Sequence, residues 1–276
     1  MIINSIQGGG GIRLHVREWG NASAPSILFI HGWSQNHLCW SKQYESELAT
    51  SYRLVALDLR GHGMSEAPHQ ASAYQNPQLW ADDIAAIMKE LLLERPILVG
   101  WSYGGFIICD YIRAYGQENI SGIVFAGAAT TLHPPTLSEF IGPGFINVVT
   151  DAISEDLPTS LLAMRQFMHN CIAKPLALED LETALCWQMV VRPDVRGALV
   201  TREINSDNVL RSLRVPLLVA HGRQDYVVLP TMAEHVLETC PKATASWYND
   251  VGHAPFLEDP ARFNRELAEL VHHVRH

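Results

Sequence analysis

The sequence LVGWSYGG at residues 98–105 contains the pattern Gly-x-Ser-x-Gly, with Ser102 at its centre. The apolar residues before it predict a buried strand, and the apolar segment after it, closed by Gly116, predicts a helix. A sharp turn from strand to helix crowds the backbone, so small residues are needed on both sides of the serine. Such a turn lifts the serine hydroxyl above the sheet, at the positive end of the helix. We therefore expect Ser102 to be a nucleophile rather than a serine that only tolerates a tight turn.

Short apolar runs alternate with amphipathic helical segments along most of the chain. Runs of this length fit strands that are buried on both faces of a parallel sheet. Near the amino terminus, residues 2–6 and 12–19 predict an antiparallel hairpin. The sequence therefore predicts an α/β fold with a mostly parallel central sheet and helices on both faces. The other predicted strands are residues 27–30, 54–57, 97–99, 122–126, 217–220 and 245–248.

The alternation of strands and helices stops between about residues 130 and 208, where we find no strong strand signal. Roughly 75 residues between two strands are too many for a loop in a compact domain. We therefore expect residues 130–208 to form a helical cap inserted over the carboxyl edge of the sheet. Residues 1–129 and 209–276 then form the core domain; an unusually long crossover connection is the alternative. The cap opens on HPP at residues 133–135, and its predicted helices are residues 161–171, 178–191 and 195–204.

A nucleophilic serine needs a base to take its proton, and the base needs an orienting partner. In this architecture the chain order is serine, acid, histidine. His253 follows the last predicted strand, so it should lie at the same edge of the sheet as Ser102. Asp225 follows the strand at residues 217–220 and would hold the imidazole in the right tautomer, with Asp250 as the fallback. The competing histidines lie in predicted helices or in the tail: His235, His272, His273 and His276.

An oxyanion hole is expected beside the serine. In this architecture it uses the backbone N–H of the residue after the nucleophile, here Tyr103, and an N–H from the loop after an earlier strand. That loop begins His31-Gly32-Trp33, so the Trp33 N–H is the second candidate. We interpret His31 as a structural hydrogen-bonding residue. The turn at residues 58–65, which contains His62, is also interpreted as structural.

Composition excludes several classes of function. Twenty Lys and Arg against 29 Asp and Glu give a net charge of −9, a poor surface for nucleic acid. The five cysteines are widely spaced without a CxxC pair, which argues against a disulfide framework or a zinc site and fits a reducing compartment. No signal peptide and no apolar run of about 18 residues is found, so no membrane span is expected. We therefore expect a cytoplasmic protein; whether it forms a homodimer is left open.

With these motifs assembled, the chain resembles the α/β-hydrolase superfamily over nearly its whole length outside the cap. The resemblance implies Ser102, Asp225 and His253 as a catalytic triad, Trp33 and Tyr103 as oxyanion donors, and no metal or organic cofactor. Haloalkane dehalogenases and epoxide hydrolases in that superfamily carry an aspartate nucleophile. Hydrolases of carbon–carbon bonds usually have Asn before the nucleophile, where this chain has Trp101.

Within the superfamily, the segment HGWSQNHLCW at residues 31–40 resembles the branch of cofactor-free haloperoxidases and arylesterases. That branch typically has Met after the nucleophile, whereas this chain has Tyr103. Some acyl-homoserine lactone hydrolases share the GWS elbow and a helical cap. The expected function is hydrolysis of carboxylic esters through an acyl-enzyme, with a lactonase or a perhydrolase as alternatives. A small-molecule receptor built on the same fold is the alternative from a different class.

The substrate is expected to be a small or medium apolar ester or lactone, held in a pocket under the cap. For most of the pocket candidates, packing between cap and core is the simpler interpretation. The candidates that sequence position suggests are Trp101, Phe140, Phe145, Phe167 and Trp187, with Met168 and Met189 beside them.

Overall fold

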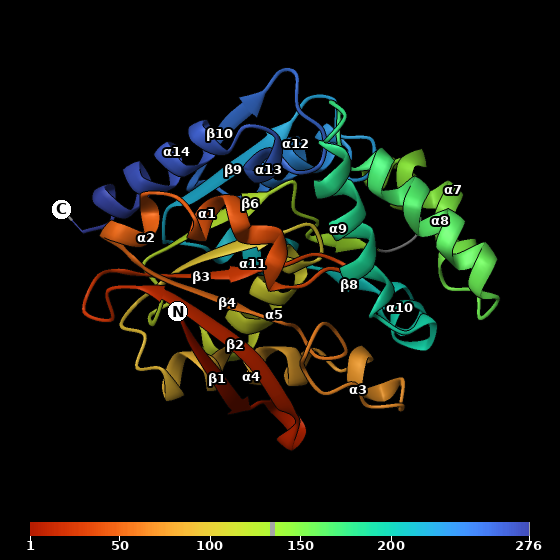
Figure 1. The fold of residues 1–276 in the computed structure, drawn as a ribbon. Helices are drawn as coiled ribbons and strands as arrows, with labels where there is room; N and C mark the ends of the chain where they lie inside the picture. The colour runs from red at the N-terminus through yellow and green to blue at the C-terminus, as the bar shows by residue number, and fades with distance from the viewer. Residues whose placement is uncertain (133–135, 276) are drawn as a thin grey trace.

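An eight-stranded sheet runs through the middle of the computed structural model, which describes residues 1–132 and 136–275 (Figure 1). The strand order is β1-β2-β4-β3-β5-β6-β9-β10. β1 and β2 form the predicted antiparallel hairpin, β2 also pairs antiparallel with β4, and the remaining neighbours are parallel. The strands are β1 (Ile2–Gln7), β2 (Arg13–Gly20), β3 (Ser26–Ile30), β4 (Arg53–Leu57), β5 (Ile97–Trp101), β6 (Gly122–Ala126), β9 (Leu217–Gly222) and β10 (Ala243–Tyr248).

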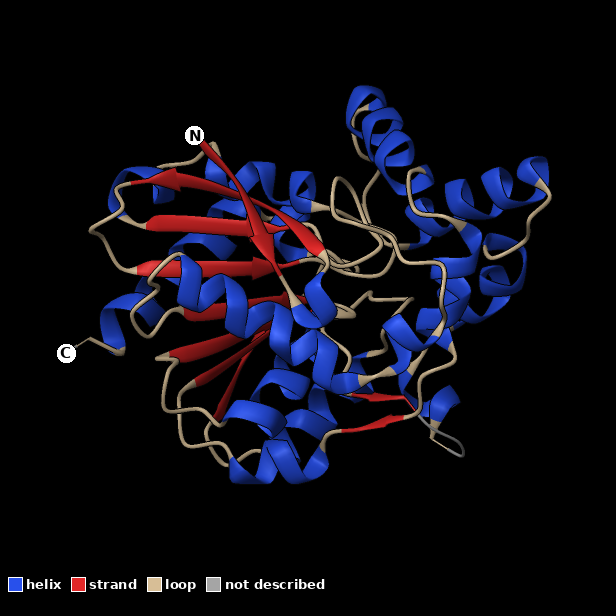
Figure 2. Ribbon diagram, turned by 90° about the horizontal axis from the view of Figure 1, so that it is seen from below, coloured by secondary structure: helices blue, strands red, loops and turns tan. Residues whose placement is uncertain are grey.

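Helices cover both faces of the sheet (Figure 2), which confirms the predicted α/β class. Successive strand residues point to opposite faces, so each strand contributes to two apolar cores. Leu98 packs in the core beneath α4 and α5, whereas Val99 packs in the core beneath α14. The first core is covered by α4 (Pro77–Glu90), α5 (Gly104–Tyr115), α11 (Asp207–Ser212) and α12 (Pro230–Thr239), and the second by α1 (Ser41–Tyr44), α2 (Leu48–Ser51), α13 (Pro255–Glu258) and α14 (Pro260–His273).

Five helices of the segment predicted as a cap lie beyond the carboxyl ends of the parallel strands (Figures 1 and 2). The helix at residues 178–191 is observed nearly as expected, and the one at 161–171 begins earlier. The first two helices of the segment were not foreseen. The division of the chain into core and cap domains stays a prediction. The helices are α6 (Leu137–Phe140), α7 (Pro143–Ala152), α8 (Leu157–Asn170), α9 (Leu178–Met189) and α10 (Pro193–Val200).

The expectation that this segment lacks strands is wrong. β7 (Thr131–Leu132) pairs antiparallel with β8 (Ile204–Asn205), and the two form a separate two-stranded sheet. Strands of two residues are too short to show an alternating pattern, and their partners are far apart in the chain. The helix predicted at 195–204 is therefore shorter than expected. It ends at Val200, and Ile204 lies in β8. Residues 133–135 lie outside the described residues.

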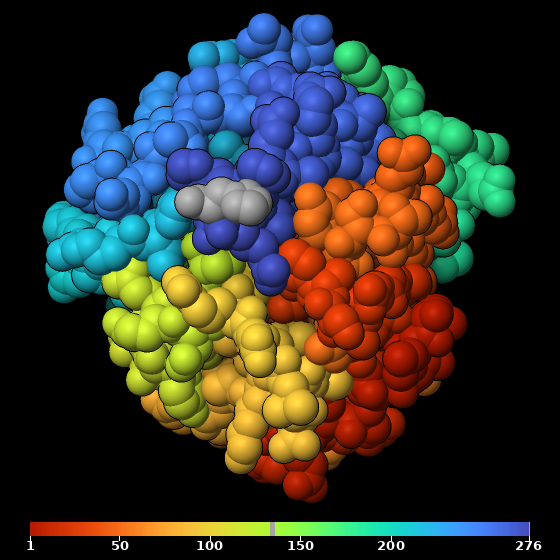
Figure 3. All heavy atoms as spheres, turned by 90° about the vertical axis from the view of Figure 1, so that its left-hand side faces the viewer, coloured from red at the N-terminus to blue at the C-terminus, as the bar shows by residue number. Residues whose placement is uncertain are grey.

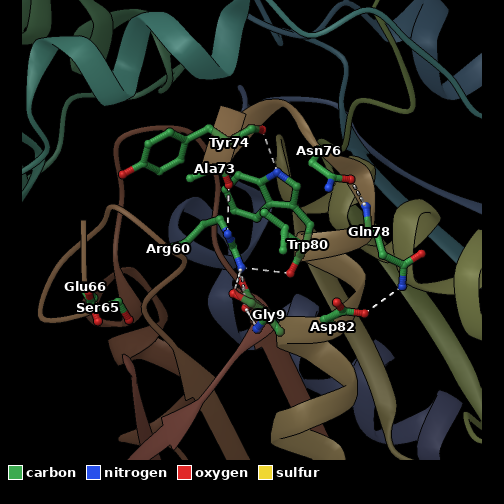
Figure 4. A network of polar contacts seen from close by, with 12 residues as sticks. Gly9, Arg60, Ser65, Glu66, Ala73, Tyr74, Asn76, Gln78, Trp80 and Asp82 are labelled. Carbon is green, nitrogen blue, oxygen red and sulfur yellow. Dashed lines mark hydrogen bonds and ion pairs between the residues drawn. The ribbon is translucent and has the colours of Figure 1, made fainter. Parts of the chain in front are cut away.

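The turn at residues 58–65, interpreted above as structural, is held by a buried ion pair between Arg60 and Asp83. Both Arg60 and Asp83 are fully buried, and the Arg60 Nε and one terminal nitrogen each donate to Asp83 at 2.8 Å. The other guanidinium hydrogens reach the carbonyls of Ala73, Gly9 and Leu79 (Figure 4). The turn is thereby tied to the 3-10 turn at Gly9–Gly11, to α3 (Ser72–Gln75) and to α4.

Figure 3 shows the face that lies at the left of Figure 1, where the first third of the chain (red to yellow) meets the last quarter (blue). Within the described ranges, no helix combines the length and the apolar composition needed to cross a bilayer.

Candidate active site

Ser102 lies at the sharp turn between β5 and α5. Its φ is +52°, in the left-handed region that non-glycine residues rarely adopt. The turn is held at both ends of the residue: the Ser102 N–H donates to the Ala126 carbonyl at 3.2 Å, and the Ser102 carbonyl accepts from the Ala129 N–H at 3.0 Å. The strained backbone of Ser102 is therefore fixed by the end of β6 and the residues that follow it.

The glycines around Ser102 are required by close backbone approach. A Cβ on Gly104 would come within 2.4 Å of the Ile30 carbonyl oxygen, and one on Gly100 within 2.8 Å of the Gly104 oxygen. A Cβ on Gly32 would meet the Ser102 Cβ at 2.9 Å. The loop that follows β3 thus lies directly against the serine. This crowding is the structural reason for the glycine pattern seen in the sequence.

His253 and Asp225 form a buried pair at the carboxyl edge of the sheet. The His253 Nδ1 and the Asp225 Oδ2 are 2.8 Å apart, and both side chains are almost completely buried. Since an ionised carboxylate only accepts hydrogen bonds, Nδ1 carries the proton and donates it. The His253 Nε2 has no hydrogen-bond partner among the described residues. The neutral ring is therefore held in the tautomer that leaves Nε2 free to accept a proton.

The charge on Asp225 is strongly favoured. Burial raises the pKa of Asp225, but the nearby charge of His253 and hydrogen bonds from His221 and His253 outweigh it and lower that pKa to about 2. Asp225 Oδ1 also accepts the N–H groups of Val227 and Val228, each at 2.9 Å. His221 was not singled out from the sequence; its Nε2 lies 3.2 Å from Asp225 Oδ2 and 2.9 Å from the Val228 carbonyl oxygen.

Ala126 and Gly127, at the end of β6, lie against Ser102 and His253 respectively. Ala126 accepts from the Ser102 N–H, and a Cβ on the next residue, Gly127, would lie 3.2 Å from His253 Nδ1. Gly127 has a φ of +51°. The structure thus brings the three residues predicted as a triad to one place, around Gly127.

The loop that carries His253 is tied to the segment after α8. The His253 N–H donates to the Cys171 carbonyl at 2.8 Å, and the Trp101 indole donates to the His253 carbonyl at 2.9 Å. Glu258 accepts the N–H of Gly252 at 2.9 Å and that of Ala173 at 2.7 Å. Glu258 was missed by the sequence reasoning, because its partners after α8 lie more than 80 residues away and no spacing signals them.

Of the two predicted oxyanion donors, Tyr103 follows Ser102 in the chain, and Trp33 follows Gly32 in the loop that lies against Ser102. Neither the Trp33 nor the Tyr103 backbone N–H donates to an acceptor among the residues that the structure describes. Their side chains are anchored further away: the Trp33 indole donates to the Arg196 carbonyl at 3.1 Å, and the Tyr103 hydroxyl donates to the Leu199 carbonyl at 3.3 Å. Both donors therefore belong to backbone that is fixed by contacts with α10.

A small apolar cavity of about 40 Å³ opens beside Ser102. Phe145 and Phe167, two of the expected pocket residues, line it together with Trp33 and Val227. The rings of Phe145 and Phe167 lie edge-on to the Trp33 ring, with centroids 5.2 and 5.3 Å away. Shape and polarity of this cavity suit a compact apolar group.

Three other expected pocket residues do not line the cavity at Ser102, and their part in a substrate pocket stays a prediction. Trp101 and Trp187 line a second, larger pocket that does not include Ser102. The Trp101 side chain lies on the α14 face of the sheet, because it shares the orientation of Val99 two residues earlier. Phe140 lines neither pocket and packs against the His235 ring, with centroids 5.0 Å apart.

The remaining histidine predictions concern structural roles. His31 donates from Nδ1 to the Gly32 carbonyl and accepts from the Leu59 N–H at 2.9 Å, while His62 accepts from the Ser34 N–H at 3.2 Å. Burial lowers the pKa of His31 to about 3 and that of His62 to about 4. Both rings are therefore neutral hydrogen-bonding groups.

The competing candidates for base and acid lie away from the site. Asp250 is exposed in a turn, and His235 is paired with Asp207 at 2.8 Å. His272 and His273 lie in α14, and His276 is outside the described residues.

Within the described ranges, one group offers three potential metal ligands: His15, His37 and Asp58. The Asp58 oxygens are already engaged, since Oδ1 accepts from the His37 N–H and lies 2.6 Å from its ring Nδ1, and Oδ2 accepts from the Met64 N–H. These bonds hold the turn after β4 and the start of the 3-10 helix η2 (His37–Trp40). We interpret the group as structural.

Comparison with known proteins gives consistent results. The family model for the alpha/beta hydrolase fold matches residues 25–260. The crystal structure of an esterase from Rhodococcus sp. ECU1013 is similar to this one, with a TM-score of 0.93 and 36% sequence identity. The superposition covers 98% of each chain. The pimeloyl-[acyl-carrier protein] methyl ester esterase of Vibrio campbellii is 25% identical over 93% of this chain and 98% of its own length. The bifunctional esterase/perhydrolase of Acinetobacter calcoaceticus is 28% identical over 79% of this chain and 80% of its own length.

Proposed function

This chain belongs to the α/β-hydrolase fold family, and we propose that it is a serine hydrolase that cleaves carboxylic esters with a short acyl group. The observation that carries the proposal is the buried His253–Asp225 pair with a free Nε2, next to the strained turn that holds Ser102. The esterases among the relatives support the same reaction class.

In the proposed mechanism, the Ser102 hydroxyl attacks the ester carbonyl while His253 Nε2 takes its proton. The Trp33 and Tyr103 N–H groups hold the oxyanion; one such donor is worth about 3 kcal/mol of transition-state stabilisation. His253 then returns the proton to the leaving alkoxide, which departs as an alcohol and leaves an acyl-enzyme. Water, deprotonated by the same ring, attacks the acyl carbon, and the acid is released as Ser102 regains its proton.

The Asp225 carboxylate stays ionised throughout this cycle. Its pKa of about 2 lies far below that of an ordinary aspartate, so it stabilises the imidazolium that forms on His253. The volume at Ser102 limits the acyl group. The cavity is small, about 40 Å³, and lined by apolar side chains, so we expect it to take a short acyl group such as acetyl better than a long chain.

The first test compares the wild type with Ser102→Ala on p-nitrophenyl acetate, butyrate and octanoate. We expect the wild type to prefer acetate and the variant to lose at least about 10³-fold in kcat, as for other triad nucleophiles. Mass spectrometry of the wild type quenched during turnover should show an acetyl group on Ser102. Near-wild-type turnover by the variant would refute the assignment of the nucleophile.

Perhydrolysis is the second candidate, because one relative is a bifunctional esterase/perhydrolase. In that reaction hydrogen peroxide replaces water as the acceptor of the acyl group, so one acyl-enzyme serves both outcomes. Adding peroxide during acetate ester turnover and measuring peracetic acid distinguishes them. A lactonase would instead hydrolyse acyl-homoserine lactones, and ring opening of such a lactone by this protein is the assay that distinguishes it.

A small-molecule receptor on this fold would release one equivalent of p-nitrophenol and then fall nearly silent. Steady turnover after the first equivalent supports the enzyme instead. The comparison needs only stopped-flow records at several enzyme concentrations.

A further inference from the structure

The larger pocket is lined by Trp101, the residue before Ser102, whereas Ser102 itself does not line it. It has a volume of about 170 Å³ and is enclosed by η2, α1, α9 and α13. We propose that it binds a single aromatic ring that carries a hydrogen-bond acceptor oxygen, such as an aryl ketone, a phenol or the aryl portion of an ester.

The size and the walls of the pocket point to a ring. A cavity of about 150 Å³ lined by apolar side chains binds benzene, and this pocket is slightly larger. Trp101, Trp187, Phe256 and Tyr44 contribute aromatic surface, and Met168 adds an adaptable apolar contact. Such walls favour offset or edge-on packing against a flat ligand.

Gln35 supplies the polar specificity. Its side chain is buried, and its Oε1 accepts from the Trp187 indole at 2.9 Å. Because that indole is only a donor, the amide has to present oxygen to Trp187 and its NH₂ elsewhere. The Gln35 Nε2 is buried and has no partner among the described residues. A buried donor of this kind is costly unless it is satisfied, and Gln35 lines the pocket, so we infer that a small turn of the amide lets an acceptor oxygen on the ligand satisfy it.

The rim of the pocket carries one positive and one negative side chain. Lys42 and Asp180 line it, both partly exposed, and their side chains approach to 4.0 Å. The two charges offset each other, so the entrance favours neither anions nor cations. A neutral ligand suits the pocket best.

The pocket and the cavity at Ser102 are lined by residues that are adjacent in the chain. Trp101 lines the pocket and Ser102 lines the cavity, and the same holds for Met168 and Phe167 on α8. The ring could therefore come from the leaving group of an ester or from a separate small molecule. The assignment of the ring to a leaving group rests on the proposed ester hydrolysis, whereas the binding of a ring to the pocket does not.

The binding test uses acetophenone, a neutral single ring with a carbonyl oxygen, and ethylbenzene, which has the same shape without the oxygen. Calorimetric titration of the wild type should show acetophenone binding more tightly than ethylbenzene. Ala184→Leu fills the pocket from its buried side and Thr183→Leu from its exposed side, and each should weaken acetophenone binding by about tenfold or more. Gln35→Leu should abolish the preference for acetophenone over ethylbenzene.

Ala177→Leu is the matched control, since Ala177 is exposed just before α9 and does not line the pocket. It should bind acetophenone like the wild type. Circular dichroism checks that each variant is folded, and Thr183→Leu serves if Ala184→Leu is not. No acetophenone binding by the wild type, or unchanged binding by the filled variants, would overturn the proposal.

A second arm separates the two sources of the ring. If KM for phenyl acetate rises in Thr183→Leu while KM for methyl acetate does not, the ring is the leaving group of the substrate. If acetophenone binding is lost while neither KM changes, the ring belongs to a separate ligand. If no ester is hydrolysed at all, the proposed function fails, and the calorimetric result alone decides the binding site.

Discussion

Gly127 shows how strictly single residues are constrained around the proposed triad. Its φ of +51° disfavours any residue with a side chain, and a Cβ there would come within 2.6 Å of the His253 carbonyl oxygen and 3.4 Å of Asp225 Oδ2. The position therefore has room for a hydrogen only. A methyl group would displace the histidine from its carboxylate or shift the end of β6.

We expect Gly127→Ala to reduce kcat for a short ester by about 10- to 100-fold, because a small misplacement of catalytic groups is costly. Gly197→Ala is the control: Gly197 lies inside α10, and the nearest atom to an added Cβ is 4.0 Å away. That variant should keep full activity and gain about 0.5–1 kcal/mol of stability from the helix propensity of alanine. Unchanged kcat in Gly127→Ala would contradict the crowding argument.

The sequence carried different amounts of information about different residues. Ser102, Asp225 and His253 follow strands at one edge of a sheet, and glycines mark the tight turn, so local signals were enough to predict them. Trp101 was misplaced because proximity in sequence to Ser102 says nothing about which face of β5 a side chain occupies. The period of two along the strand, with Val99 in the core beneath α14, could have corrected it.

At the scale of elements, Glu258 joins three pieces of chain. It lies at the end of α13, and its two oxygens accept the N–H of Gly252 in the histidine loop and that of Ala173 after α8. Burial raises the pKa of Glu258, which shows that the carboxylate is held in poorly solvated surroundings. The contact links the position of His253 to the helical segment above the sheet.

Replacing Glu258 by Gln should lower kcat about tenfold with a smaller effect on KM, because the amide keeps only one acceptor and turns an NH₂ group toward a backbone donor. Asp259→Asn, on the next residue, removes a charge but keeps a capping oxygen for α14 and should be nearly neutral. Kinetics on p-nitrophenyl acetate measure both. Equal losses in the two variants would point to a general effect of charge.

At the scale of the whole molecule, the buried histidines make stability depend on pH. Burial lowers the pKa of His31 to about 3 and that of His62 to about 4, whereas in the unfolded chain both titrate near 6.5. Between these values the unfolded state binds more protons than the folded state. The free energy of unfolding should therefore fall as the pH drops below 6.5 and continue to fall to about pH 3, where His31 also becomes protonated in the folded state.

His62→Gln isolates one contribution, since a glutamine can accept from the Ser34 N–H and donate to the Arg60 carbonyl as His62 does. From pH 7 to pH 4, the wild type should lose about 3 kcal/mol more stability than this variant, the equivalent of a pKa lowered from 6.5 to about 4. Urea denaturation at several pH values measures the difference. Parallel curves for the two proteins would exclude His62 as the source.

Most of the sheet and its order of helices could be predicted, because buried parallel strands appear as apolar runs and amphipathic helices show their own period. The segment above the sheet could be predicted only as helical. Its packing depends on contacts such as the Trp33 indole with the Arg196 carbonyl, 163 residues apart, which no local pattern encodes. The positions of Phe140 and Trp187 relative to the cavity at Ser102 follow from that packing, so no local pattern could predict them.

The pairing of β7 with β8 has a consequence for how the chain could be rebuilt. It joins Thr131 to Asn205, so the helical segment leaves and returns through two neighbouring points, about 5 Å apart in an antiparallel pair. The segment between the two strands has more than 70 residues, yet it is attached to the rest of the chain as a hairpin loop is, through two adjacent ends. A foreign segment of another length, ending in the same two-residue strands, could be grafted at this junction without altering the spacing of β6 and β9.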